Sequence, residues 1–399
     1  TSQGHIIHTG DYRIDETPSD GIPFDAPGFA ELGKEGVALL LSDSTNAMVP
    51  GHTTSEASVA TNLEELIAPW KERVVVTLFS SNLYRASSLY KIAKKQGRTL
   101  CLVGRSLETY LRVGRATTNL DLPDPDKLPS LSDSLGIPDA RKMIICTGSQ
   151  AEPRSALVQA ASGKHRTFSI GHGDLILFSS RVIPGNERRV HRMLNSLMRR
   201  GATCVVRNEK PIHASGHAKQ DELARMVELT TPRYFVPIHG EYSFLQGHRD
   251  LAEAHGASQT RVVTNGDVLE LEPSSLKVIA KVDATPYFDD GAVIGTAEEI
   301  KLNEKRRMAW NGAVAAHIRI SNTKGQSKKI SVSIQSGGLF SNEGQLDEEA
   351  SEKIRKDLSE LPDGIPPDSF LEQAQQITRR FYRKRFGKRP LVFVQVERN

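Results

Sequence analysis

Four short segments place carboxylates or imidazoles at or just beyond the ends of apolar runs. They are HTGD at 8–11, SDSTN at 42–46, HASGH at 213–217 and PIHGE at 237–241. A histidine or aspartate in such a place often only caps a turn, so each segment alone is weak evidence of function. Together, imidazole and carboxylate ligands from several strand-end loops are what a hydrolytic zinc site requires. The segments therefore predict metal-dependent hydrolysis if the fold brings them together.

The elements that must position these segments are short runs rich in Val, Ile and Leu, separated by stretches with helical periodicity. Runs of this length, bounded by Gly, Ser, Asn and Asp, are typical of buried strands, and their alternation with helices predicts α/β layers. Polar residues collect at the C-terminal ends of the runs, which is the edge where open α/β sheets bind ligands. The runs include residues 37–46, 73–82, 142–150, 174–180 and 233–241.

The bulk composition is that of a folded protein with about two or three domains. Of the 399 residues, 38% are hydrophobic and 25% charged, so disorder is not expected. No apolar run approaches the roughly 20 residues that span a bilayer, and the first residues lack a signal-peptide pattern. We therefore expect a cytoplasmic protein without a membrane partner. The three cysteines stand singly in apolar segments and are interpreted as core residues.

Basic residues are concentrated toward the C-terminal end. The run from Arg379 to Arg385 interleaves cations with aromatic residues, a pattern seen in proteins that bind single-stranded nucleic acid. Phe370, Ala374, Ile377 and Phe381 nevertheless fall at helical spacing. This spacing favours a helix with core-facing aromatics and a solvated basic face.

The order of motifs along the chain resembles the ribonuclease J family from end to end. The series is HTGD, LLSDSTN, SSNxxR, VGRS, TGSQxEP, PGNE, HxSGH, PIHGE and NGDVLEL. The resemblance implies part of a metallo-β-lactamase αβ/βα sandwich, an inserted β-CASP α/β domain and a small C-terminal α+β domain. The implied boundaries are 1–55 and 215–275 for the metallo-β-lactamase domain, 56–214 for the β-CASP domain, 276–298 for a linker and 299–399 for the C-terminal domain.

The resemblance also implies roles for the first set of residues. Asp11 resembles the carboxylate that bridges two zinc ions, and His239 resembles the last metal ligand. Asp43 and His217 resemble the carboxylate and the histidine of β-CASP motifs A and B. Asp43 would then orient His217, whose imidazolium would protonate the departing ribose 3′-oxygen.

Two flexible loops are expected to hold phosphate. Backbone N–H groups and hydroxyls in TGSQ and HASGH could surround an anion, although an ordinary glycine turn is the alternative for either loop alone. Because the family uses these loops to hold a 5′-terminal phosphate, the resemblance implies RNA binding by Ser149, His213, Ser215 and Gly216. Four further residues are weaker candidates and are mostly expected to be solvated surface residues: Arg85, Arg105, Arg181 and Asn186.

The family's HxHxDH motif and the histidine ligand after it would precede Thr1. His5 and His8 match the strand that leads into HTGD, so structural or turn roles are expected for them. The 399 residues alone would supply two metal ligands, too few for a tight site with two zinc ions, and we expect them to be inactive.

The implied function is zinc-dependent hydrolysis of RNA phosphodiester bonds in RNA processing and decay. The resemblance implies 5′-to-3′ exonuclease activity that prefers 5′-monophosphate ends, together with endonuclease activity, on single-stranded RNA. It also implies a homodimer or homotetramer. One alternative is a DNA-directed β-CASP nuclease, and another is a catalytically inactive RNA-binding scaffold related to ribonuclease J. The retention of both carboxylates and both histidines argues against the scaffold.

Overall fold

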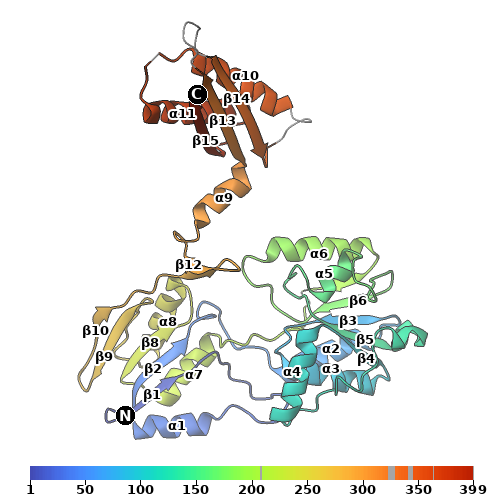
Figure 1. Cartoon of the computed structure of the whole chain (residues 1–399). Coiled ribbons are helices and arrows are strands. Elements are labelled where there is room, and N and C mark those ends of the chain that lie inside the picture. The colour runs from blue at the N-terminus through green and yellow to red at the C-terminus, as the bar shows by residue number, and fades with distance from the viewer. Residues whose placement is uncertain (207–208, 322–328, 340–344, 363, 399) are drawn as a thin grey trace. The chain divides into compact units, whose positions relative to one another are not determined.

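The computed structural model describes residues 1–206, 209–321, 329–339, 345–362 and 364–398. The chain divides into two compact units, Thr1–Val282 and Asp283–Asn399 (Figure 1). Within the described ranges, no helix combines the length and the apolar character that crossing a membrane would demand.

The first sheet contains three parallel strands in the order β1-β2-β8. These strands are β1 (His5–His8), β2 (Val37–Asp43) and β8 (Tyr234–Ile238). Alternate residues point to opposite faces, so Leu40 and Phe235 pack toward the helices while Leu39 and Val236 face the other way. The helices around this sheet are α1 (Ala26–Glu35), α7 (Gln220–Thr230) and α8 (Tyr242–Ala254).

A β-hairpin packs against the second face of this sheet through Leu276. It pairs β9 (Asp267–Glu272) with β10 (Ser275–Lys281). Residues 276–281, expected in the linker, therefore belong to a strand. The sequence did not indicate this strand, because its residues are mostly exposed and lack a buried-exposed alternation. The strand is held instead by backbone hydrogen bonds to β9.

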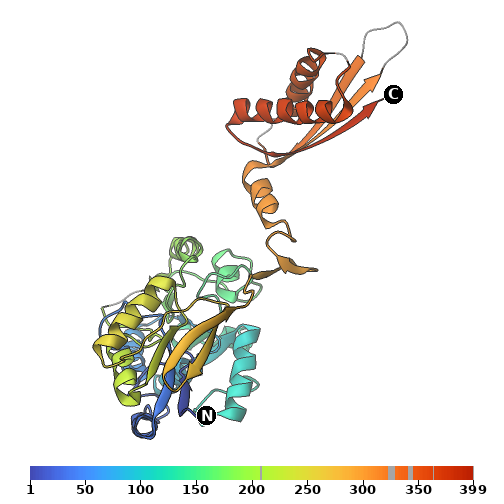
Figure 2. The same cartoon turned by 90° about the vertical axis from the view of Figure 1, so that its left-hand side faces the viewer.

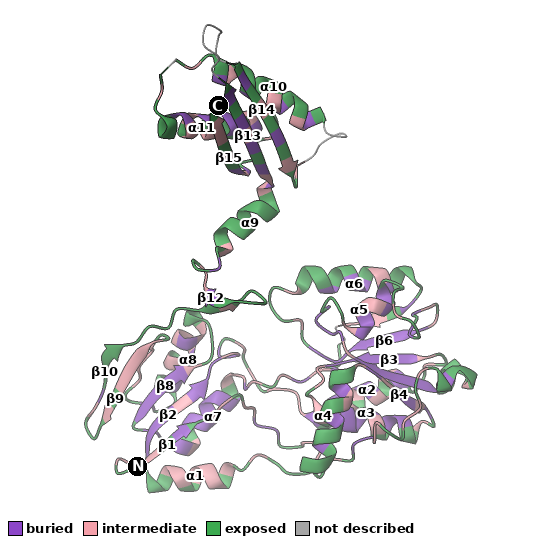
Figure 3. Cartoon of the chain, viewed as in Figure 1, coloured by how far each residue is buried: buried purple, intermediate pink, exposed green. Residues whose placement is uncertain are grey.

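The second sheet has five parallel strands in the order β4-β5-β3-β6-β7. Their bounds are Val74–Thr77 (β3), Thr99–Val103 (β4), Lys142–Cys146 (β5), Leu175–Phe178 (β6) and Thr203–Val205 (β7). Because both faces are covered by helices, the three central strands β5, β3 and β6 are wholly buried, whereas the edge strand β7 is partly exposed (Figure 3). Cys101 and Cys146 lie in this core and Cys204 is half-buried, which confirms the interpretation of the cysteines as packing residues.

Helices cover the five-stranded sheet in two groups. One face packs against α2 (Glu56–Ile67), α3 (Leu83–Lys95) and α4 (Arg105–Thr117), and the other against α5 (Ala156–Ala161) and α6 (Glu187–Arg199). The SSN motif begins α3, because the Asn82 side chain accepts a hydrogen bond from the Arg85 backbone N–H at 3.0 Å. Two short 3₁₀ turns, Asp133–Gly136 and Asp139–Arg141, precede β5. Together with the first sheet, these layers confirm the predicted α/β class.

The second unit is the predicted small α+β domain. Its sheet has the order β14-β13-β15, and α10 (Gln345–Ser359) and α11 (Pro367–Phe386) lie on one face of it (Figure 2). The strands are β13 (Ala313–Ser321), β14 (Lys329–Gly337) and β15 (Leu391–Arg398). Before them come β11 (Tyr287–Asp289), β12 (Ile294–Thr296) and α9 (Leu302–Asn311).

Candidate metal and catalytic site

The four residues that the sequence singled out for metal binding and catalysis meet at one edge of the first sheet. Asp11, Asp43 and His239 follow or end the neighbouring parallel strands β1, β2 and β8, whose C-terminal ends share that edge. His217 reaches them from the loop before α7. One ligand atom from each residue lies within 4.8 Å of the others. The convergence on which the sequence argument depended is therefore present.

Asp43 and His217 form the tightest pair in this group. The Asp43 carboxylate lies 2.7 Å from His217 Nδ1, and the Asp43 side chain is only 1% exposed. Its other oxygen accepts hydrogen bonds from the backbone N–H and the hydroxyl of Thr45 at 3.0 and 2.7 Å. Both oxygens are thus engaged by protein donors, which suits an orienting carboxylate better than a metal ligand.

The pair has a defined electrostatic state. Burial is the largest influence on the Asp43 pKa and raises it, but the hydrogen bonds from His217 and Thr45 together outweigh burial and lower that pKa to about 2. The hydrogen bond to Asp43 in turn raises the pKa of His217 against the opposing effect of burial. The carboxylate is therefore ionised at neutral pH and favours the protonated form of the imidazole, with Nε2 left to face a substrate.

Asp11 and His239 form the open part of the site. Asp11 Oδ1 lies 3.4 Å from His239 Nδ1, and both side chains are more than half exposed. His239 has a left-handed backbone with φ 55°, a strained conformation for a residue with a side chain. Its ring stacks on that of His217 with centroids 5.5 Å apart. Carboxylate oxygen and imidazole nitrogen at one accessible position are donors that fit a zinc ion, although two ligands supply only part of its coordination.

Thr45 is a site residue that the sequence analysis missed. Besides its bonds to Asp43, its hydroxyl oxygen lies 3.1 Å from His239 Nδ1 and 3.2 Å from the His239 carbonyl oxygen. Thr45 therefore links the two carboxylate-histidine pairs. The Asp-Ser-Thr spacing contained a signal for it, because an aspartate often accepts from the backbone N–H two residues later.

The HASGH loop is held beside the Asp43–His217 pair. Asn46 donates to the Ser215 hydroxyl at 2.9 Å and to the His217 carbonyl at 2.8 Å, and the His217 N–H also donates to Ser215 Oγ at 3.1 Å. Gly216 is exposed between these anchors. The predicted phosphate residues Ser215 and Gly216 are therefore adjacent to His217, on a loop whose geometry Asn46 sets.

His213 lies deeper in the same loop. Burial, reinforced by the positive charge of Arg85, lowers the pKa of His213 to about 4, so its ring is neutral at pH 7. Its Nδ1 is buried and has no hydrogen-bond partner among the residues that the structure describes. A neutral imidazole can offer one N–H donor but no positive charge to a ligand.

Ser149 sits apart from the HASGH loop. It follows β5, is 2% exposed and lines a cavity of about 1330 Å³ together with Phe79 and Arg105. Among the described residues it makes no hydrogen bond to residues 213–217. The connection is indirect: Gln150 donates to the Arg181 carbonyl at 2.8 Å, and the Arg181 guanidinium donates to Asn46 Oδ1 at 3.2 Å.

Arg85 contradicts the expectation of a solvated surface residue. Its side chain is fully buried and pairs with Glu56 at 2.8 Å, while its guanidinium donates to the Ile212 carbonyl at 2.8 Å. Glu56 also pairs with Arg13 at 3.1 Å, and Arg13 donates to the Ser215 carbonyl at 3.4 Å. Two arginines and one carboxylate therefore tie the start of α2 to both ends of the HASGH loop. Of the other weak candidates, Arg105 and Arg181 are exposed and Asn186 is half-buried.

A buried histidine beneath the site predicts acid sensitivity. His248 is fully buried, its Nδ1 lies 2.9 Å from Ser44 Oγ, and burial lowers its pKa to about 4. Its pKa in the unfolded chain is about 6.5, so the unfolded chain binds more protons between these values. This contribution to stability is complete above pH 6.5 and is lost as the pH falls toward 4. We expect the loss of stability to reach roughly 2 to 3 kcal/mol at pH 4.5.

Urea unfolding of the natural chain and of His248→Gln at pH 7.5 and 4.5 measures this effect. Glutamine cannot titrate, so the difference in stability between the two proteins should shrink on acidification. An equal difference at both pH values would show that His248 does not contribute to acid sensitivity.

The fold and the site together define the metallo-β-lactamase class with a β-CASP domain. Family models match in order along the chain: "Ribonuclease J, beta-CASP domain" over residues 71–197, "Zn-dependent metallo-hydrolase RNA specificity domain" over 206–264 and "Ribonuclease J C-terminal domain" over 300–399. The chain belongs to the ribonuclease J family.

Curated relatives agree with this assignment. Ribonuclease J of Thermus thermophilus is 34% identical over 398 residues, which cover 98% of this chain and 68% of that protein. Ribonuclease J of Synechocystis is 38% identical over 81% of this chain and 50% of its own length, and that of Sinorhizobium meliloti is 36% identical over 80% and 56%. The chain therefore spans about half the length of the latter two relatives.

Proposed function

We propose that this protein hydrolyses RNA phosphodiester bonds with the help of two zinc ions. The observation that carries the proposal is the convergence of Asp11, Asp43, His217 and His239 within 4.8 Å in a chain of the ribonuclease J family. Asp11 and His239 would supply ligands to the metal, with the other ligands contributed by the HxHxDH segment that the family resemblance implies. Bound zinc would polarise the scissile phosphate and activate water.

The chain's own residues would perform the proton transfer. Asp43 holds His217 by Nδ1, which orients the ring and favours its protonated form. His217 Nε2 would then donate its proton to the ribose 3′-oxygen as the phosphodiester bond breaks. Thr45 would hold the side chains of Asp43 and His239 in fixed positions relative to each other during this step, because its hydroxyl contacts both.

We further propose a preference for a 5′-monophosphate end, with 5′-to-3′ exonuclease and endonuclease activity. Support comes from the exposed Gly216 and the hydroxyl of Ser215 next to His217, and from the buried, unpartnered Nδ1 of His213. Ser149, on its separate loop, would contact RNA farther from the scissile bond. His213 would act through a neutral N–H donor rather than through charge.

Other features remain part of the same proposal. The domain boundaries would be those that the family resemblance implies, except that strand β10 (Ser275–Lys281) belongs to the first unit and not to the linker. The protein would act in the cytoplasm, and it would assemble as a homodimer or homotetramer. The DNA-directed nuclease and the inactive scaffold are the two alternatives, and both are outcomes of the following experiment.

Chelation tests the metal requirement. A protein that carries all the metal ligands of the family should degrade single-stranded RNA bearing a 5′-monophosphate. It should lose this activity in EDTA and regain it with added Zn²⁺. Asp11→Asn and His239→Ala should weaken zinc binding by at least about tenfold, because each removes a ligand. Cleavage of a matched DNA strand at the same rate would favour the DNA nuclease, and RNA binding without any cleavage would favour the scaffold.

A further inference from the structure

The C-terminal unit contains a groove whose walls are basic. Its volume is about 1240 Å³, and it lies between α11, α9 and the residues just before β15. Two glutamines, Gln373 and Gln376, add polar groups, and none of the lining residues is acidic. Six cations line it: Arg307, Arg379, Arg380, Arg383, Lys384 and Arg389.

The helix α11 builds one wall because its two faces differ. Phe370, Ala374 and Ile377 are buried against the sheet as predicted, but Phe381 is only partly buried and its neighbour Tyr382 is the fully buried ring. Residues three and four positions apart share a helix face, so Arg380, Arg383 and Lys384 lie together on a face beside the buried one, where Ile377 also lines the groove. The solvated basic face expected from the sequence is therefore one wall of a groove.

The second wall is anchored to the first. The Leu391 N–H donates to the Gly312 carbonyl at 3.1 Å, and the Arg389 N–H donates to Asn311 Oδ1 at 3.4 Å. These bonds hold the end of α9 beside the start of β15. Arg307 on α9 and Arg389 before β15 thereby face the same groove as the cations of α11.

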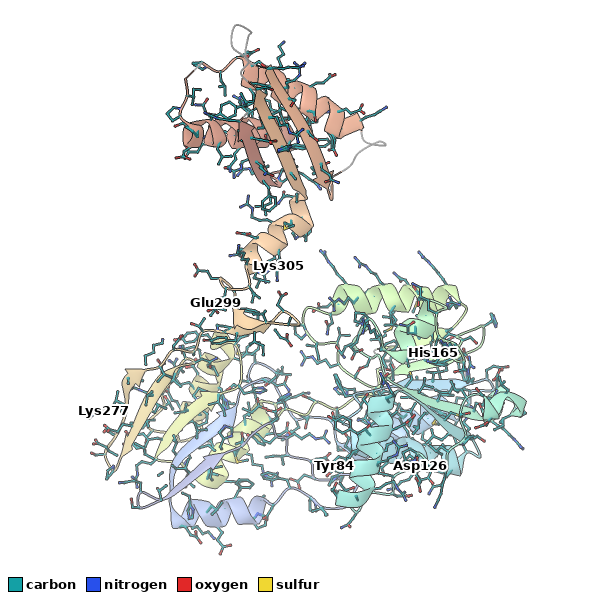
Figure 4. The ribbon with its side chains drawn as sticks, viewed as in Figure 1. Tyr84, Asp126, His165, Lys277, Glu299 and Lys305 are labelled. Carbon is teal, nitrogen blue, oxygen red and sulfur yellow. The ribbon has the colours of Figure 1, made fainter. Side chains whose placement is uncertain are left out.

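The lining cations have no acidic partners. None of the six forms an ion pair with a carboxylate in the part of the chain that the structure describes. Arg385, on the same helix but outside the groove, pairs with Glu349 at 3.4 Å. Lys305 on α9, which Figure 4 labels, pairs with Asp290. Clustered like charges repel each other, so a groove of unpaired cations is suited to a polyanion.

An exposed tryptophan stands next to the groove. Trp310 is 81% exposed and lies one turn after Arg307 on α9, at the i, i+3 spacing that places two side chains on one face. A large exposed indole beside cations is the combination with which proteins bind single strands, since bases stack on the ring while cations follow the phosphates. A double helix would keep its bases inaccessible to this ring.

We propose that this groove binds single-stranded RNA, with the phosphates on the six cations and a base on Trp310. The inference rests on the proposed function, because it takes RNA as the ligand. A second copy of the chain is disfavoured, since a twofold contact through this groove would set cations against cations. An acidic protein segment would satisfy the charges but leaves Trp310 without a role.

Fluorescence of Trp310 gives a direct test in the full chain. The sequence has two tryptophans, and Trp70 lies in the other unit, where its indole donates to the Gly173 carbonyl. In a Trp70→Phe background, a 12-nucleotide 2′-O-methyl oligoadenylate in EDTA should quench the fluorescence of Trp310. Replacing Arg380 and Arg383 with alanine should weaken binding on the order of tenfold and reduce the slope of log K against log salt by about 1.4.

Arg385→Ala is the matched control, because it removes an arginine from the same helix outside the groove. It should leave the affinity within about twofold. Equal weakening by the control and by the double substitution would overturn the proposal, as would an unchanged affinity in the double variant. A double variant that changes the sedimentation coefficient but not RNA binding would assign the groove to protein association instead.

The two proposals fail separately. Binding is measured without metal, so a chain that binds through the groove but never hydrolyses RNA refutes only the proposed function. The opposite outcome refutes only the groove: His217→Ala abolishes hydrolysis, whereas the double substitution changes neither hydrolysis nor RNA binding.

Discussion

Replacing His217 with alanine should lower the rate of RNA hydrolysis by about 10²- to 10⁴-fold, with little change in RNA affinity. This range is typical for the loss of a positioned acid-base group. The histidine is held at 2.7 Å by a buried carboxylate that favours its protonated form, so it is prepared to donate a proton. Single-turnover cleavage of a labelled RNA measures the chemical step apart from product release.

Asp43→Asn separates orientation from charge in the same pair. Asparagine has a similar shape but cannot hold the imidazolium by its charge, so a large loss is expected here as well. The combined variant should be scarcely slower than either single one, because the two residues act as a unit. His52→Ala is a suitable control, since His52 is an exposed histidine that pairs with Asp221 on the surface. A normal rate in His217→Ala would remove the general-acid role.

Glu56→Ala should cost about 3–5 kcal/mol of unfolding free energy, the usual effect of stripping buried cations of their partner. The carboxylate pairs with Arg85, which is fully buried, and with Arg13, which is 16% exposed. Without it, the fully buried guanidinium of Arg85 would lose its carboxylate partner, whereas Arg13 would keep its ion pair with Asp15 at 3.0 Å. Urea denaturation of the full chain, followed by far-UV circular dichroism, measures the change.

A surface pair supplies the comparison. Lys94→Ala breaks an ion pair with Asp121 in which both side chains are about half exposed, and it should leave the stability nearly unchanged. Replacing Glu56 and Arg85 together by leucine and methionine should restore part of the stability, because no isolated charge remains between them. A loss below 1 kcal/mol in Glu56→Ala would show that water reaches the arginines.

Several parts of the site were predictable from local pattern. The apolar runs before HTGD, SDSTN and PIHGE form parallel neighbours, and parallel strands bring their C-terminal ends to one edge. Asp11, Asp43 and His239 therefore had to approach one another once the strand order was set. That order itself is a tertiary property, since β8 joins β2 across almost two hundred residues of intervening chain.

Other parts depended on contacts that no local pattern contains. Arg85 has the sequence signature of a surface residue, yet Glu56 and the Ile212 carbonyl make its burial possible. Ser149 and Ser215 lie on similar glycine-containing loops, but of the two, in the described parts of the chain, only Ser215 is hydrogen-bonded to Asn46 and His217. Burial and partner choice are set by which elements pack together, and they cannot be inferred from residue type.

By itself, the sequence predicted the α/β layers, the family and a set of candidate site residues, because hydrophobic period and motif order are local properties of the chain. Only the tertiary structure decided that Thr45 contacts both Asp43 and His239, that Glu56 pairs with the buried Arg85 and with Arg13, and that the basic face of α11 is a wall of a groove. Each of these depends on atoms brought together by packing from distant segments. The residues of HTGD, SDSTN, HASGH and PIHGE are thus positioned by neighbours that contact them only after the chain has folded.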